Sequence, residues 1–216
     1  MADLFDQMAD TNRDKQELAR GALCLPAFVL DRAEEVIAEL EPILTQAPLR
    51  HLITPGGHKM SVAMSNCGEL GWVSDRGGYR YQELDPLSGQ AWPAMPKLFL
   101  DLAQQVAQEA GYKRFQPQAC LINQYLPGSK MSLHQDKDEN NKSAPIVSLS
   151  FGINAEFLFG GLSRGSPTKR LTLQHGDAVV WGGPSRFCFH GVQPLKDSEH
   201  SLLGRQRINI TFRQVY

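Results

Sequence analysis

A histidine and an aspartate stand two positions apart at His134 and Asp136, and a further histidine, His190, follows much later in the chain. In an extended segment, residues i and i+2 point to the same face, about 7 Å apart along the chain. His134 and Asp136 can therefore converge on one ion while Gln135 points away. With His190 from a distant strand, two histidines and one carboxylate would hold a metal with open positions, which is typical of non-haem Fe(II) oxygenases.

The spacing of these residues alone also allows a second interpretation, in which they bind no metal. A single His-x-Asp pair arises by chance in many chains of this composition. His190 ends an apolar run, residues 187–190, where a buried core histidine is the ordinary occupant. The metal site needs support from other residues.

A second group of polar side chains lies near the C-terminus, where the segment 207–213 alternates strictly between polar and apolar residues. In a strand, alternate residues share one face. The polar face would carry Arg207, Asn209, Thr211 and Arg213. One interpretation is a solvated face of an edge strand, and the other is the lumen of a barrel that binds an anion.

A second expected strand favours the lumen. Leu121, Asn123 and Tyr125 share a face there and offer an amide and a phenol to the same cavity. Arginine binds carboxylates through two parallel hydrogen bonds, and 2-oxoglutarate carries a carboxylate at each end. A divalent metal with Arg207 and Arg213 would form a positive pocket suited to this dianion. The pattern predicts 2-oxoglutarate as a co-substrate beside the metal.

The elements that must position these residues are predicted from periodicity and turn signals. We expect one helix that opens at an N-cap Asp31 and is kinked or shortened by Pro42, and a second from Pro96 to Gly111. Short strands are expected at 119–126, 146–151, 156–159, 171–174, 178–181, 187–192 and 207–213. The fold class is α+β, mainly β: a sandwich or jelly roll buttressed by the N-terminal helices. We expect one domain over 1–216, with an N-terminal arm at 1–20, a recognition lid at about 50–92 and the core at about 119–216.

The bulk composition is that of a soluble globular protein. The 216 residues carry a formal net charge of −1, so any nucleic-acid partner would need a local positive surface. Four widely separated cysteines without a CxxC pair suit a reducing cytoplasm and argue against a disulfide framework. No apolar run approaches the length of a membrane span.

At these residues the sequence resembles the AlkB family of Fe(II)/2-oxoglutarate-dependent dioxygenases, close to its bacterial prototype. The similarity runs from Thr54 to the C-terminus, and the last of its motifs is the most specific. The matching motifs are His134-Gln-Asp136-Lys-Asp138, His190-Gly191, Arg207-x-Asn-x-Thr-Phe-Arg213, Asn123-Gln-Tyr125-x-Pro-Gly, Pro145-Ile-Val-Ser and His175-Gly-Asp177 through Trp181-Gly-Gly.

The resemblance implies a double-stranded β-helix whose catalytic centre is iron held by His134, Asp136 and His190. It implies O2 and 2-oxoglutarate as co-substrates. The keto-acid end of 2-oxoglutarate would lie near Arg207 and its far carboxylate would pair with Arg213. Asn123, Tyr125 and Asn209 would assist in binding this co-substrate.

The resemblance also implies a reaction. Small alkyl groups would be removed oxidatively from bases of the 1-methyladenine and 3-methylcytosine type, with release of succinate, CO2 and formaldehyde. The substrate would be alkylated DNA, above all single-stranded, with double-stranded DNA and RNA left open, and the enzyme a cytoplasmic monomer without a membrane partner. The base would be sandwiched between Trp72 and His134, with Asp138 and Arg164 around it, and Tyr79 would touch the substrate backbone.

Two other functions are compatible with the same residues. The iron chemistry can serve a different substrate, such as a protein side chain, a lipid or another small molecule, because fold and ligands do not determine substrate. A non-enzymatic, cupin-like metal or anion sensor would explain the barrel and the ligands, but gives no reason for Arg207 and Arg213 to face the metal. For Trp72, the alternative to a base-stacking role is a structural one, in which the aromatic ring anchors a loop.

Overall fold

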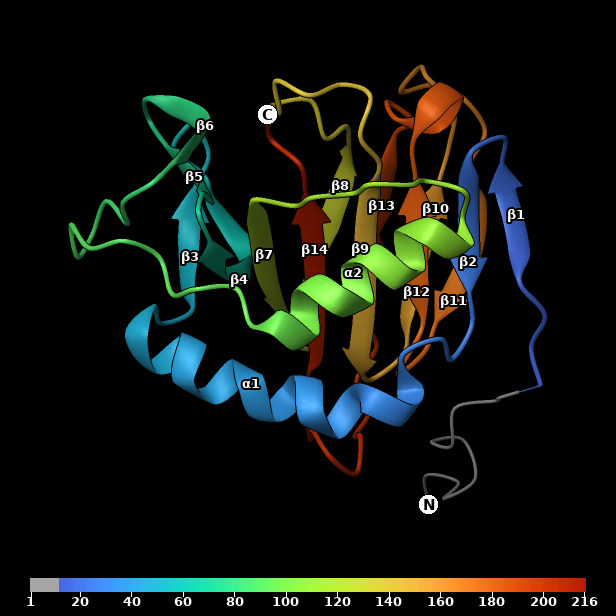
Figure 1. Cartoon of the computed structure of the whole chain (residues 1–216), viewed down its shortest axis with the longest axis horizontal. Helices are drawn as coiled ribbons and strands as arrows, with labels where there is room; N and C mark the ends of the chain where they lie inside the picture. The colour runs from blue at the N-terminus through green and yellow to red at the C-terminus, as the bar shows by residue number, and fades with distance from the viewer. Residues whose placement is uncertain (1–11) are drawn as a thin grey trace.

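Two β-sheets stack against each other in the computed structural model of the chain, which describes residues 12–216 (Figure 1). The large sheet runs, in spatial order, through β1 (Gln16–Ala19), β2 (Ala22–Leu25), β12 (Ala178–Trp181), β9 (Ile146–Gly152), β14 (Arg207–Arg213), β7 (Ala119–Tyr125), β4 (Lys59–Gly68) and β3 (Arg50–Ile53). The small sheet consists of β11 (Lys169–Leu173), β10 (Ala155–Phe159), β13 (His190–Val192) and β8 (Met131–His134). Two further strands, β5 (Gly71–Asp75) and β6 (Gly78–Gln82), form a separate hairpin at one end of the molecule.

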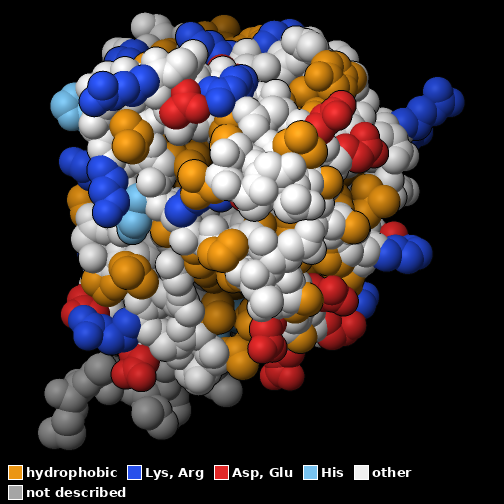
Figure 2. Space-filling model, turned by 90° about the vertical axis from the view of Figure 1, so that its left-hand side faces the viewer, with side chains coloured by type: hydrophobic (Ala, Val, Ile, Leu, Met, Phe, Trp, Pro, Cys, Tyr) orange, Lys and Arg blue, Asp and Glu red, His pale blue; other side chains and the backbone are white. Residues whose placement is uncertain are grey.

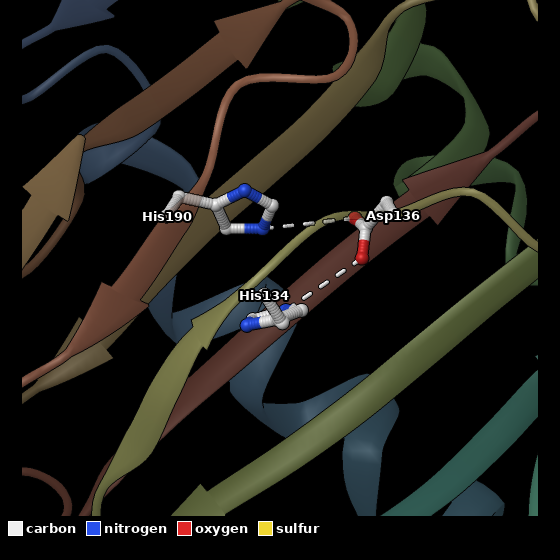
Figure 3. Close-up of side chains that lie close together, drawn as sticks. All are labelled: His134, Asp136 and His190. Carbon is white, nitrogen blue, oxygen red and sulfur yellow. Dashed lines mark ion pairs between the residues drawn. The ribbon is translucent and has the colours of Figure 1, made fainter. Parts of the chain in front are cut away.

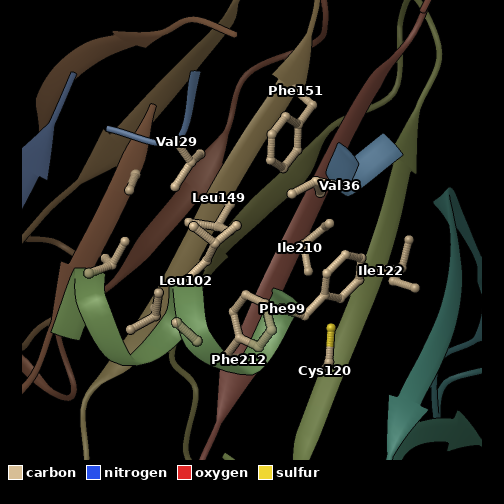
Figure 4. Packing of buried hydrophobic residues seen from close by; sticks show 14 of the residues in the cluster. Val29, Val36, Phe99, Leu102, Cys120, Ile122, Leu149, Phe151, Ile210 and Phe212 are labelled. Atoms are coloured by element: carbon tan, nitrogen blue, oxygen red, sulfur yellow. The ribbon is translucent and has the colours of Figure 1, made fainter. Parts of the chain in front are cut away.

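Strand β14 lies in the middle of the large sheet and pairs along its whole length with β7 and with β9. All seven of its residues are buried. Its apolar side chains Ile208, Ile210 and Phe212 pack in the cluster beneath the helices (Figure 4). Its polar side chains point to the other face, toward the small sheet. The edge-strand interpretation of segment 207–213 is therefore wrong.

Two helices cover the outer face of the large sheet, as expected (Figure 1). Helix α1 (Ala33–Gln46) follows a short 3-10 turn, η1 (Leu30–Arg32), and its N-cap residue is Arg32 without a side-chain cap. The predicted cap at Asp31 is wrong, because η1 already occupies that residue. Pro42 does not end the helix, which continues to Gln46.

Helix α2 (Lys97–Glu109) begins after Pro96, close to the prediction. Gly111, just past its end, has a positive φ of 85°, the left-handed conformation of a C′ glycine. The buried face of α2 includes Phe99, Leu102 and Val106. Phe99 meets Phe212 of β14 edge to face, with ring centroids 6.3 Å apart, so the helix packs directly on the strand that carries both arginines.

The mainly β jelly-roll fold with buttressing helices is confirmed, and each strand expected after residue 119 has a counterpart. The hairpin of β1 and β2 was not predicted. Gly21 closes it with a positive φ of 83°, where a Cβ atom would lie 2.7 Å from the carbonyl oxygen of Gly182. The β1 strand falls within the expected N-terminal arm, whose residues 1–11 lie outside the described range.

The expected lid region, 50–92, divides between two parts of the fold. Strands β3 and β4 extend the large sheet, and only β5 and β6 stand apart from it. All four cysteines are free and buried. Across residues 12–216, none of the helices is both long and apolar enough to span a bilayer.

Candidate active site

His134, Asp136 and His190 meet at the open end of the small sheet (Figure 3). His134 ends β8 and His190 begins β13, and the two residues are direct partners in the antiparallel pairing of these strands. Nε2 of His134 lies 3.7 Å from Oδ1 of Asp136, and Nε2 of His190 lies 3.9 Å from Oδ2. All three ligand atoms lie within 4.8 Å of one another, so they can hold one ion.

Hydrogen bonds orient both imidazole rings toward this common point. Nδ1 of His134 donates to the carbonyl oxygen of Ser132 (2.9 Å), and Nδ1 of His190 donates to that of Cys188 (3.1 Å). Each ring therefore carries its proton on Nδ1 and offers the lone pair of Nε2 to a metal. The indole of Trp181, 4.7 Å from His190 between ring centroids, packs against the second ring.

The electrostatics favour the protonation states that a metal requires. Burial, and then the nearby His134, lower the pKa of His190 to about 4, so its imidazole is neutral at physiological pH. Burial raises the pKa of Asp136, but Arg213 and the two histidines outweigh this effect and hold it below its usual range. Two imidazole nitrogens and one carboxylate fit a divalent cation such as Fe(II).

Beyond the triad, Arg207 is a buried cation without a charged partner. It is 1% exposed, and no carboxylate among residues 12–216 pairs with it. Its Nη2 donates to Oγ of Ser150 (2.9 Å), and its guanidinium carbon lies 4.9 Å from the ring centroid of Tyr125. Three buried guanidinium nitrogens find no hydrogen-bond partner within residues 12–216: Nε and Nη1 of Arg207 and Nη1 of Arg213. These orphaned donors fit the carboxylates of a dianion.

Of the two arginines, Arg213 contacts the metal-binding carboxylate, with its Nη2 3.0 Å from Oδ2 of Asp136. This contact favours the opposite order from the expected one, in which the keto-acid end of 2-oxoglutarate lay near Arg207. Strand alternation alone shows only that both side chains share a face. Which end of β14 lies beside the metal depends on how the loop after β8 returns to the sheet.

One cavity of about 430 Å³ joins the metal triad to both arginines. Every residue expected in the site lines it: His134, Asp136 and His190; Asn123, Tyr125, Arg207, Asn209 and Arg213; Trp72, Tyr79, Asp138 and Arg164. Thr211 lines it as well. Chain segments far apart in sequence thus converge on a single concave site.

At the mouth of the cavity, Trp72 links the hairpin β5–β6 to the metal-binding loop. Its Nε1 donates to Oδ2 of Asp138 at 2.8 Å. Its ring stacks on that of Tyr79, with centroids 5.4 Å apart and planes inclined by 13°. Trp72 is half-buried and Asp138 exposed, so both remain within reach of an entering ligand.

Several residues of the site were not predicted from the sequence. Ser148 and Ser150 of β9 bind the side chains of Asn209 and Arg207 (2.7 and 2.9 Å). Glu139 and Arg186 form a buried ion pair beside the triad. No sequence motif predicts these contacts. The serines at alternate positions of the apolar strand 146–151 do indicate that Ser148 and Ser150 share one face of that strand.

Comparisons with known proteins agree with this geometry. A family model described as the 2OG-Fe(II) oxygenase superfamily matches residues 21–213. The alpha-ketoglutarate-dependent dioxygenase AlkB of Escherichia coli (strain K12) is 53% identical over 211 residues, which cover 98% of each chain. A DNA N(6)-methyladenine demethylase, ALKBH1C of Arabidopsis thaliana, is 34% identical over 62% of this chain and 35% of its own length.

A solved structure, described as the structure of OsALKBH1, superposes with a TM-score of 0.81 at 27% identity. The superposition covers 93% of this chain and all of the other. The matches span the triad, both arginines and the sheets that hold them, and they imply Fe(II) and 2-oxoglutarate at this site. The chain belongs to the 2OG-Fe(II) oxygenase superfamily and, within it, to the AlkB family of 2-oxoglutarate-dependent dioxygenases.

Proposed function

We propose that the chain removes small alkyl groups from the ring nitrogens of nucleic-acid bases, in a reaction coupled to the decarboxylation of 2-oxoglutarate. The observation that carries the proposal is the cavity lined by the metal triad, by two arginines that each keep unpaired N–H donors, and by the aromatic side chains of Trp72 and Tyr79. The triad accounts for oxygen chemistry, the arginines for a dicarboxylate, and the aromatic mouth for a flat substrate.

The two arginines serve opposite ends of the co-substrate in this proposal. Arg213, held beside Asp136, lies next to the keto-acid end that binds the metal. Arg207 receives the far carboxylate through Nε and Nη1, which have no hydrogen-bond partner among residues 12–216. Tyr125 and Ser150 hold the Arg207 guanidinium in place, because they contact it from a ring face and from a hydroxyl.

The mouth of the cavity suits an alkylated base that has left its stack. Stacking on Trp72 and His134 would compensate for the lost stacking, and an N-alkylated adenine or cytosine is cationic. The carboxylate of Asp138, oriented by the indole N–H of Trp72, is placed to attract that charge and to accept a hydrogen bond from an exocyclic amine. Arg164 and Tyr79 line the same rim.

Local positive charge supports a nucleic-acid partner despite the net charge of −1. Exposed Lys137 and Arg164 line the cavity. On the face at the hairpin end, Lys and Arg side chains are most frequent at the upper left, with some acidic side chains among them (Figure 2). Single-stranded DNA as the preferred substrate, the monomeric state, the cytoplasmic location and the boundary of the β5–β6 lid stay predictions.

A metal held by His134, Asp136 and His190 would supply the activation of O2. One oxygen atom enters succinate as 2-oxoglutarate loses CO2, and the other becomes the hydroxyl of the oxidised alkyl group. A hydroxymethyl group on a ring nitrogen then leaves as formaldehyde and restores the base. The protein's own residues bind the dicarboxylate, orient the base and exclude water from the cavity.

The test is turnover with Fe(II), 2-oxoglutarate and a short single strand bearing 1-methyladenine or 3-methylcytosine. Succinate, formaldehyde and loss of the methyl mass are followed together, and the unmodified strand serves as the control. We expect the two products in equal amounts with restoration of the base. Succinate without demethylation would move the search to a non-nucleic-acid substrate, and absence of both products would contradict the oxygenase assignment itself.

A further inference from the structure

Four charged side chains are buried together around the metal-binding aspartate. Arg186 and Glu139 have side chains that are 1% and 2% exposed, and those of Asp136 and Arg213 are 8% and 9% exposed. They come from three distant segments: the loop after β8, the residue after η2 (Gly183–Ser185), and the end of β14. The two arginines and two carboxylates balance formally, as buried charges must.

Arg186 contacts the loop that carries Asp136 at three points. Its Nη1 donates to the carbonyl oxygen of Asp136 (2.6 Å), and its Nε donates to that of Ala144 (2.9 Å). Its Nη2 pairs with Oε2 of Glu139 (2.7 Å). The planar guanidinium therefore fixes the backbone at both ends of the segment 136–144 and one side chain between them.

Glu139 extends these contacts back to the carboxylate of Asp136. Its Oε1 accepts a hydrogen bond from the hydroxyl of Tyr81 (2.6 Å) and lies 3.3 Å from Nε of Arg213. Arg213 in turn holds Oδ2 of Asp136. The contacts close a ring that constrains Asp136 through its backbone and through its side chain. Tyr81 belongs to β6, so the ring also reaches the hairpin at the mouth of the cavity.

Stability alone is a poor reason for this arrangement. A buried ion pair loses most of its Coulomb energy to desolvation, and well-packed apolar residues in its place are often as stable or more so. Arg186 is not among the residues that line the cavity. Its three side-chain hydrogen bonds end on the loop that carries a metal ligand, and ligating carboxylates depend on such outer hydrogen bonds for their orientation.

We propose that Arg186 is a positioning residue for the metal-binding carboxylate, acting through Glu139 and the backbone of Asp136. Tyr81 ties this ring to the β5–β6 hairpin, so the hairpin influences how the metal is held. The inference rests on the metal-binding role of Asp136 in the proposed function. It is independent of which substrate enters the cavity.

The test measures metal binding without any nucleic acid. Co(II) is titrated into the metal-free protein anaerobically, and its visible absorption reports affinity and coordination. We expect Arg186→Met and Glu139→Gln to weaken Co(II) binding by about 10- to 100-fold and to change the spectrum. Tyr81→Phe, which removes one hydrogen bond, should weaken it by about 2- to 10-fold. Arg186→Lys keeps the charge but not the planar group that makes all three hydrogen bonds. Its Co(II) affinity should therefore lie between those of Arg186→Met and the unaltered protein.

Two matched controls remove similar interactions elsewhere. Arg50→Met breaks the partly buried pair between Arg50 and Asp85 (2.6 Å), and Tyr112→Phe removes a hydroxyl that donates to the carbonyl oxygen of Gly21 (2.7 Å). Both should bind Co(II) as the unaltered protein does, even where Tm falls.

The outcomes separate the inference from the proposed function. Unaltered Co(II) binding in Glu139→Gln and Tyr81→Phe, or full recovery in Arg186→Lys, would overturn the positioning role. If Arg186→Met does not fold, Glu139→Gln and Tyr81→Phe decide the matter. Failure of the unaltered protein to bind Co(II) would overturn the metal site of the proposed function, and the inference with it.

Discussion

Replacing Arg207 with methionine should abolish tight co-substrate binding and, at the same time, stabilise the ligand-free protein. Arg207 is 1% exposed, with one hydrogen bond to Ser150 and a contact with the ring of Tyr125. Two of its donor nitrogens have no hydrogen-bond partner in the part of the chain that the structure describes. A buried charge without a counter-charge costs several kcal/mol even after relaxation, and methionine fills a similar volume without that cost.

The size of the stability effect follows from opposing contributions. The variant loses a cation–π contact worth about 1–2 kcal/mol and a hydrogen bond from a charged donor worth about 1.5–3 kcal/mol. The variant no longer carries the desolvation cost of the buried charge, for which about 4 kcal/mol is a low value. Burial of the methionine side chain contributes about 2 kcal/mol more. The balance is roughly 1–3.5 kcal/mol in favour of the variant, and each kcal/mol raises Tm by about 2–4 °C for a chain of this length.

The effect on binding has the opposite sign and is larger. Truncating one partner of a buried, hydrogen-bonded charge pair costs about 2–4 kcal/mol, which weakens 2-oxoglutarate binding by about 30- to 1,000-fold. Thermal denaturation of the metal-free proteins and calorimetric titration of 2-oxoglutarate with Mn(II) in place of Fe(II) measure the two effects separately.

Arg213→Met is the matched comparison, because it changes the same residue type in the same strand. Arg213 has two carboxylate partners, Asp136 and Glu139. Its loss leaves both buried without that counter-charge, so Tm should fall rather than rise. A lower Tm for Arg207→Met together with 2-oxoglutarate binding within twofold of the unaltered protein would refute the reasoning and make Arg207 a structural residue.

The remaining predictions concern the triad, the aromatic mouth and acid stability. Asp136→Ala should abolish metal binding and turnover, because it removes the single anionic ligand; full activity would contradict the triad. Trp72→Ala should lose turnover of a methylated strand while metal and 2-oxoglutarate binding persist, and unchanged turnover would exclude base stacking. Lowering the pH from about 6.5 to 4 should lower Tm. Burial and the nearby His200 depress the pKa of His175 to about 4 from 6.5, so its neutral folded form is fully favoured above pH 6.5 and is lost on protonation. The loss is at most about 3 kcal/mol, and His175→Gln should show a smaller pH dependence of Tm.

Local pattern was enough to predict the strand β14 and both of its faces. Strict alternation over Arg207–Arg213 separates polar from apolar side chains, whatever the partners are. The same holds for Leu121, Asn123 and Tyr125 on β7, which line the cavity as expected. His134 and Asp136 are close in sequence, so their convergence required only an extended segment.

What escaped prediction depends on register and on loops that cross between sheets. The direct pairing of His190 with His134 is a property of the sheet, not of either segment alone. Arg186 reaches Asp136 because the turn η2 and the loop after β8 meet, and no periodicity relates residues 50 positions apart. The failed N-cap at Asp31 has a local cause: a 3-10 turn already occupies that residue, so the N-cap is Arg32, one residue later.

Strand β14 shows why fold and site cannot be separated in this protein. Its apolar residues form the core under α2, where Phe99 packs against Phe212, and its polar residues place two guanidinium groups in the cavity. Pairing with β7 and β9 along its whole length leaves the strand no freedom to slide, because a shift by one residue would exchange core and cavity faces. The hydrophobic contact that stabilises the sheet therefore also maintains the position of the two anion-binding arginines. The cost of burying Arg207 without a counter-charge is tolerated because the rest of the strand is held on both sides.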